Sequence, residues 1–176
     1  AAAMADAVIE FMSREPDKAL GAVVMNKAQA DLLQSEIDYR IASSIKAQHY
    51  ESRWAGQKNG LEKFFVKNLE NVQGDERDVM FVGTVYGPES EGKVTRQYFG
   101  PINQAAGRRR LNVLFTRAKQ RIETFSSMSA TDIRPTNPGA EMLQGWLAYS
   151  ASGVLESGAE SEKEPDSEFE VHVIEE

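Results

Sequence analysis

Arginine is concentrated in one short stretch of this 176-residue chain, GRRRLNVLFTRAKQR at residues 107–121. The stretch holds five arginines and one lysine around apolar residues at helical spacing. Arg110 and Arg117 are seven residues apart, so one continuous helix would place them on the same face, about 10 Å apart. Guanidinium groups are permanently charged and donate in a fork that fits phosphate oxygens. The stretch therefore predicts a phosphate-binding helix, with a solvated basic helix surface as the alternative.

A second polar cluster, NVQGDERDVM at residues 71–80, comes directly before an apolar run. Its glycine, Gly74, allows a sharp turn or a close approach of the backbone. The four charged residues at 75–78 would gather at one edge of a sheet. The alternative is a charged turn without a chemical role.

Residues 81–97, FVGTVYGPESEGKVTRQ, come close to the loop G-x-x-x-x-G-K-[ST] that wraps nucleotide phosphates. That loop needs a hydroxyl directly after the lysine and a helix behind it, but position 94 is valine and Gly100-Pro101 would end a helix almost at once. Without the helix there is no amino-terminal dipole for a phosphate. We interpret the stretch as a surface loop in which Arg96, Tyr98 and Phe99 either contact nucleic acid or pack within the loop.

Composition excludes several classes of protein and site. The chain has no cysteine, which excludes disulfides and thiolate metal sites, and the separation of His49 from His172 makes a metal site unexpected. No apolar run reaches the length of a membrane span, so we expect a cytoplasmic protein without membrane contacts.

The net charge of −7 is unevenly distributed along the chain. Residues 156–176 carry nine acidic residues and one lysine, whereas the rest carries 18 acidic and 19 basic residues. We predict one domain over residues 1–153 and an acidic flexible linker over 154–167. The alternation in FEVHVI suggests that residues 168–176 begin a further element.

Apolar runs alternate with helical patterns along residues 1–153. The run GAVVM is short and β-branched, as in a strand buried on both faces. Leu33, Ile37, Ile41 and Ile45 recur at every fourth residue, which predicts a single helix. The predicted strands are residues 21–25, 63–68, 78–86 and 121–127, and the predicted helices are residues 1–14, 27–50, 111–120 and 140–151. Strands separated by helices predict an α/β fold, a parallel sheet with helices on both faces.

The stretches GAVVMNKAQADLL, VQGDERDVM and RRRLNVLFTRAKQ, in this order, resemble motifs IV, V and VI of superfamily 1 helicases. The resemblance is strongest to the RNA-surveillance helicases and their bacterial multidomain relatives, and covers residues 4 to 153. It implies the second, C-terminal RecA-like domain of an ATP-driven nucleic-acid motor. Residues 168–176 also resemble the start of an endonuclease-like domain found in some bacterial relatives.

The resemblance implies roles for individual residues. Arg117 matches the arginine finger that reaches the γ-phosphate across the cleft between two RecA-like domains, and Glu76 matches the motif V acid near the ribose. Gln73 and Gly74 match the loop that carries this acid, and Gln29 matches the motif IV glutamine near the nucleotide. Relatives often have an arginine where this chain has Ala30. Either Arg110 or a residue of the other domain then supplies the second cation, or hydrolysis is slower than usual.

The implied cofactor is ATP with Mg²⁺, bound mainly by a first RecA-like domain whose Walker A and Walker B motifs this sequence does not contain. We therefore expect this chain alone to be inactive. The implied partners are that first domain and single-stranded nucleic acid, with DNA preferred over RNA. The alternative function is a catalytically silent RecA-like module that binds or regulates, in which the arginine cluster holds an acidic partner or the chain's own acidic tail.

Overall fold

The computed structural model describes residues 1–84, 86–87 and 97–153. Its centre is a parallel four-stranded sheet with the strand order β2-β1-β3-β4. The strands are β1 (Leu20–Val24), β2 (Phe65–Asn68), β3 (Arg77–Gly83) and β4 (Ala118–Phe125). The helices are α1 (Ala2–Arg14), α2 (Lys27–Ala42), α3 (Ile45–Gly56), α4 (Gly107–Phe115) and α5 (Pro138–Ser152), and the short 3₁₀ helices are η1 (Gln57–Gly60), η2 (Gly100–Asn103) and η3 (Ala130–Asp132). The predicted RecA-like α/β fold is confirmed.

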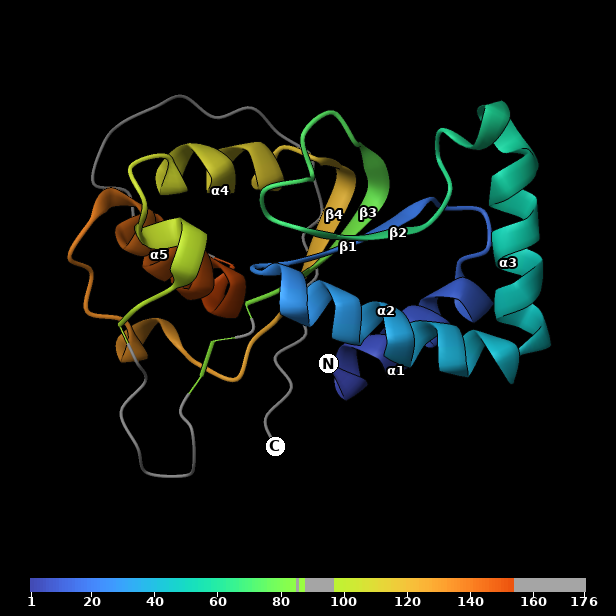
Figure 1. Cartoon of the computed structure of the whole chain (residues 1–176), viewed down its shortest axis with the longest axis horizontal. Coiled ribbons are helices and arrows are strands. Elements are labelled where there is room, and N and C mark those ends of the chain that lie inside the picture. Colours follow the sequence, from blue (N-terminus) through green and yellow to red (C-terminus); the bar gives the residue numbers. More distant parts are fainter. Residues whose placement is uncertain (85, 88–96, 154–176) are drawn as a thin grey trace.

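Helices cover the sheet on both faces, with α1, α2 and α3 on one side and α4 and α5 on the other (Figure 1). Each side has its own hydrophobic core. Every residue of β1 is buried, which explains its uninterrupted apolar sequence. None of the helices in the described ranges is both long and apolar enough to cross a membrane. The predicted linker at 154–167 and the segment 168–176 lie outside the described residues.

The single helix predicted over residues 27–50 is wrong, because the chain forms two helices there. Helix α2 ends at Ala42, and the Ser44 side chain accepts a hydrogen bond from the Ala47 amide to begin α3. Ile45 continues the spacing of the buried stripe but is 72% exposed. The serine cap therefore prevails over apolar periodicity.

The helix predicted over residues 111–120 is also wrong in its second half. Helix α4 ends at Phe115, Thr116 follows as its C-cap, and β4 begins at Ala118. The register pairs Ala118 with Arg77 of β3, so backbone pairing prevails over the helical spacing of the side chains. Arg110 and Arg117 consequently do not share a helix face. Strand β3 also ends earlier than predicted, at Gly83.

Residues 69–76 cross the sheet between β2 and β3, and we call this segment the crossover. Because β2 and β3 are parallel, the chain must return from the end where β2 finishes to the end where β3 begins. Because β1 lies between them, it must also pass over β1. It does so on the α4 side, since Leu69 and Val72 are buried in the same core as Leu111 and Leu114 of α4. The crossover and α4 therefore form adjacent layers over this face.

Candidate functional site

Arg117 lies between α4 and β4, at the end of the sheet where the strands begin. Its amide donates to the Leu114 carbonyl (3.0 Å) and its carbonyl accepts from the Arg77 amide (3.1 Å). The backbone of Arg117 is thus held on both sides, by α4 and by the start of β3. This position results from the switch from helix to strand at Thr116.

The Arg117 side chain is partly buried, 20% exposed, and has three oxygen neighbours. Its Nε donates to the Val113 carbonyl (3.0 Å) and one terminal nitrogen donates to Thr116 Oγ1 (3.2 Å). The other, Nη1, lies 3.6 Å from Glu76 Oε1. The guanidinium is therefore oriented by its own helix end while one nitrogen faces a carboxylate.

Glu76 immediately precedes β3, and its side chain is 55% exposed. A pair at this distance and exposure is weak, because solvent screens the attraction. The structure thus brings together Arg117 and Glu76, which are 41 residues apart in sequence. A phosphate group could replace Glu76 as a partner of Arg117 at small cost.

Gln73 and Gly74 are exposed in the crossover, close in sequence to Glu76. Gly74 has φ +87°, a conformation that side chains rarely adopt. A Cβ at Gly74 would meet nothing within 4 Å, so the backbone conformation and not the space requires glycine there. The predicted turn at Gly74 is confirmed.

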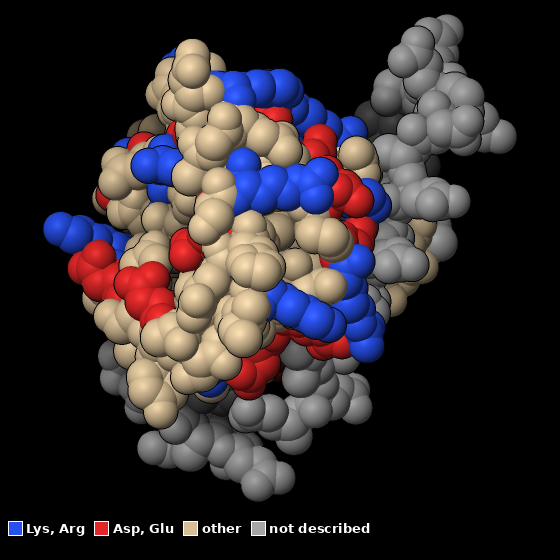
Figure 2. Space-filling model, turned by 90° about the vertical axis from the view of Figure 1, so that its right-hand side faces the viewer, with Lys and Arg blue, Asp and Glu red and all other residues tan. Residues whose placement is uncertain are grey.

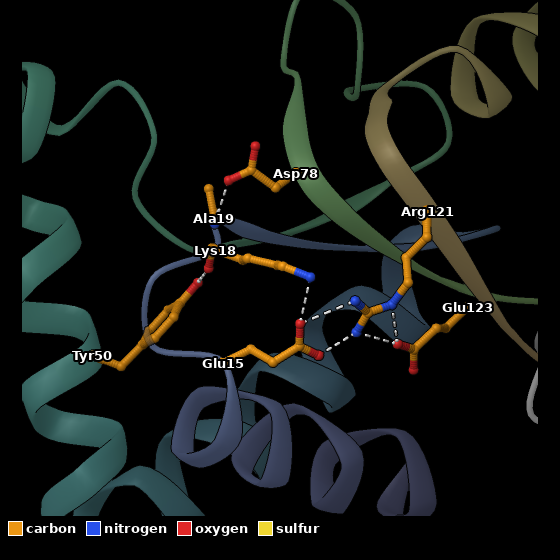
Figure 3. Close-up of polar contacts among 7 residues, drawn as sticks. All are labelled: Glu15, Lys18, Ala19, Tyr50, Asp78, Arg121 and Glu123. Carbon is orange, nitrogen blue, oxygen red and sulfur yellow. Dashed lines mark hydrogen bonds and ion pairs between the residues drawn. The ribbon is translucent and has the colours of Figure 1, made fainter. Parts of the chain in front are cut away.

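The remaining charges of the cluster at residues 75–78 have structural partners. Asp75 pairs with Lys67 Nζ at 2.5 Å. Arg77 is buried, donates to the Lys63 carbonyl at 3.0 and 2.8 Å, and has a pKa lowered by that burial. Asp78 accepts a hydrogen bond from the Ala19 amide at 2.8 Å (Figure 3). The charged-turn interpretation therefore fits three of the four residues, and Glu76 is the exception.

Arg110 lies in α4, toward the end where the helix starts. Its Nη1 donates to Gln104 Oε1 (2.7 Å) and to the Pro101 carbonyl (3.2 Å), and its Nη2 lies 3.2 Å from Glu70 Oε1. The structure therefore does not bring Arg110 to Arg117. Sequence reasoning missed Glu70 and Gln104, and neither follows a motif that would have identified it.

Gln29 lies in the first turn of α2, beyond the end of β1. Its amide donates to the capping Asn26 side chain (3.0 Å), and it borders a pocket of about 1000 Å³ beside the loop that follows β4. The five-residue length of β1, roughly 17 Å, separates this end of the sheet from the end that carries Arg117. Gln29 is therefore not part of the Arg117 site. Ala30, at the position where the resemblance implied an arginine, is buried in the core beside α1.

The loop residues weighed as nucleic-acid contacts have different surroundings. Phe99 is fully buried, so its interpretation as packing is confirmed, whereas Tyr98 is 70% exposed. Arg96 and most of the phosphate-loop-like stretch lie outside the described residues. On the face that carries α3, side chains of both signs are interspersed (Figure 2), including the pairs Arg53–Asp17 and Lys58–Glu62. That face is not a uniformly basic surface of the kind that binds phosphate backbones.

Magnesium was expected from the resemblance. Across the part of the chain that the structure describes, no group of three or more His, Asp or Glu side chains is arranged to hold a metal ion. These residues do not by themselves fit a magnesium site.

Residues 1–128 match the family model described as "AAA domain". The chain is 34% identical over 165 residues, 89% of its length, to the uncharacterized ATP-dependent helicase MG140 of Mycoplasma genitalium. It is 37% identical over 138 residues, 77% of its length, to the MG140 homolog of Mycoplasma pneumoniae. The chain spans only 14% and 12% of these two relatives.

Proposed function

Since the chain belongs to this AAA domain family and is a helicase-like domain, we propose that it is the C-terminal motor domain of an ATP-dependent superfamily 1 helicase. In this proposal a first RecA-like domain, carried by the same longer protein, supplies the phosphate loop and the magnesium ligands. The present domain closes on the nucleotide from the opposite side of the cleft.

The observation that carries the proposal is the arrangement of Arg117. Its Nε and one terminal nitrogen are held by Val113 and Thr116, while Nη1 faces the exposed Glu76. An incoming γ-phosphate would take the place of Glu76 beside Nη1 and accept the hydrogen bonds of an already oriented guanidinium. Such a group stabilises the charge of the transition state and is typically worth about 10³ to 10⁵ in rate. Glu76, Gln73 and Gly74 would then lie beside the rest of the nucleotide.

The proposed partner is single-stranded nucleic acid, with DNA preferred over RNA. Contacts of Gln29 and Arg110 with the nucleotide remain predictions, and the geometry around Arg117 does not add support to them. The silent binding module remains the second hypothesis, and the same experiment separates the two.

The test is nucleic-acid-stimulated ATP hydrolysis by the longer protein, compared with its Arg117→Ala and Arg117→Lys variants. We expect Arg117→Ala to lower kcat by about 10³-fold or more with little change in the KM for ATP, because the lost contact forms in the transition state. Arg117→Lys keeps the charge without the fork and should recover only part of the rate. Arg109→Ala, which removes an exposed arginine from the same helix, is the matched control and should keep the parent rate.

Parent-like hydrolysis by Arg117→Ala would refute the role of Arg117. A longer protein that shows no stimulated hydrolysis at all would instead favour the silent module.

A further inference from the structure

Two ion pairs connect the crossover to α4 and to Arg117 just beyond it, one pair near each end of the crossover. Glu70 meets Arg110 at 3.2 Å near the end of the sheet where the strands finish, and Glu76 meets Arg117 at 3.6 Å where they begin. Between the two pairs, the buried Val72 lies in the core that contains Leu111 and Leu114. The crossover is thus joined to the α4 segment along most of its length.

The two arginines differ in how firmly they are held. Arg110 contacts three oxygens from three separate residues. They belong to Pro101 in η2, to Gln104 directly after η2 and to Glu70 in the crossover. Only the Pro101 acceptor is backbone, but charge-assisted bonds from one planar group to three different residues together restrict its motion. Two of the oxygen neighbours of Arg117, by contrast, come from its own helix end. Arg110 therefore acts as a fixed link, whereas Nη1 of Arg117 can change its partner.

The rest of the crossover has few restraints. Gly74 has a left-handed conformation, Gln73 and Glu76 are exposed, and the Asp75 amide reaches the Val72 carbonyl at 3.3 Å. Its second half is held by the Asp75–Lys67 pair, by a bond from Nη1 of the buried Arg77 to the Glu76 carbonyl (2.7 Å) and by the bond from the Arg77 amide to the Arg117 carbonyl. Loss of the Glu70 contact would therefore loosen mainly residues 71–74, which lie before these contacts.

We infer that Glu70 and Arg110 form a positioning pair, which holds the first half of the crossover, and with it Gln73, in place next to the Glu76–Arg117 pair. This inference rests on the proposed function for its catalytic consequence. In this inference Arg110 acts on the site through the crossover, which is the alternative to the predicted contact of Arg110 with the nucleotide.

Amide hydrogen exchange on the chain itself tests the positioning without any activity. We expect Glu70→Gln and Arg110→Ala each to speed exchange of the amides of residues 71–74 by about fivefold, because a partly exposed charge pair is worth little more. The double variant should exchange no faster than either single variant, and the Tm should fall by no more than about 2–4 °C. Arg109→Ala is the control and should leave exchange at the parent level. Unchanged exchange in the crossover, or additive effects in the double variant, would overturn the inference.

Kinetics in the longer protein test the catalytic consequence. We expect Glu70→Gln and Arg110→Ala to lower kcat for ATP by a similar factor with KM unchanged, and the exchanged pair Glu70→Arg with Arg110→Glu to recover part of kcat. If Arg110→Ala raises the KM for ATP while Glu70→Gln has no effect, Arg110 binds the nucleotide directly and the inference is wrong.

The two proposals fail separately. If Arg117→Ala keeps the parent rate of ATP hydrolysis, Arg117 is not an arginine finger, but the hydrogen-exchange result still stands. If Arg117→Ala loses that rate and Glu70→Gln changes neither hydrolysis nor exchange, only the positioning pair is refuted.

Discussion

Arg121 of β4 connects the sheet to the end of α1 through Glu15, and it also pairs with Glu123 of its own strand (Figure 3). Its Nη1 donates to Glu15 Oε2 at 3.0 Å, and Lys18 Nζ contacts the same oxygen at 2.8 Å. The hydrogen bonds from Arg121 are the main reason that the pKa of Glu15 is lowered to about 2. This cluster fixes the loop between α1 and β1.

The lowered pKa gives a pH-dependent prediction for Glu15→Gln. Because the folded pKa lies below the ordinary 4.5, the stabilisation is complete above about pH 4.5 and is lost as the pH falls towards about 2. We expect the variant to have a free energy of unfolding lower by roughly 1 kcal/mol at pH 7, after allowance for partial exposure. Urea unfolding at pH 7 and at pH 3 measures the difference, which should shrink at pH 3.

The matched control is Glu10→Gln, since Glu10 pairs with Arg14 on the exposed surface of the same helix. It should change the free energy of unfolding little at either pH. An equal loss for Glu15→Gln at both pH values would show that the Glu15 carboxylate is not responsible.

At the scale of elements, α4 and α5 both begin against the carbonyl of Ile102 in η2. A Cβ on Gly107 would lie 1.8 Å from that oxygen, and one on Gly139 would lie 2.0 Å from it. Because the obstacle is backbone, we expect Gly107→Ala to lower the free energy of unfolding by about 1–3 kcal/mol. Gly145→Ala on the exposed side of α5 meets nothing within 4 Å and should raise it by about 0.5–1 kcal/mol.

Thermal or urea unfolding of Gly107→Ala, Gly145→Ala and the parent measures these changes in the free energy of unfolding. The junction at Ile102 also sets the start of α4 and hence the place of Arg110, so Gly107→Ala should disturb the crossover as well. A Gly107→Ala variant as stable as the parent would mean that η2 moves away without cost.

Local patterns explain which elements could be predicted from the sequence. The run at residues 21–25 is short and β-branched and the apolar residues of α1 have helical spacing, so both elements were predicted correctly. The break at Ser43–Ser44 was missed because Ile45 keeps the spacing of the stripe. The strand at Ala118 was missed because Leu111, Leu114 and Phe115 carry a helical pattern into it.

At the scale of the whole molecule, the candidate site depends on strand order, which local patterns do not contain. Arg117 meets Glu76 and Arg110 meets Glu70 only because β1 lies between β2 and β3, so that the crossover must pass over the sheet beside α4. The motif resemblance singled out Arg117 and Glu76 separately, as the arginine finger and as the acid near the ribose, and did not predict that they meet. It did not identify Glu70, and it grouped Gln29 with residues that lie at the other end of the strands.

A last prediction concerns the chain as a unit. We expect it, without a first RecA-like domain, to hydrolyse no ATP in the presence of Mg²⁺, because its described residues include no metal site and Arg117 would have no bound phosphate to act on. Phosphate release measured with and without single-stranded DNA tests this, and Lys93→Ala is the diagnostic variant. Turnover that disappears with Lys93→Ala would show that residues 87–95 bind phosphate after all. Turnover that disappears with Arg117→Ala instead would place a complete catalytic site within this chain. Either result would refute the proposal that two RecA-like domains together form the ATP site.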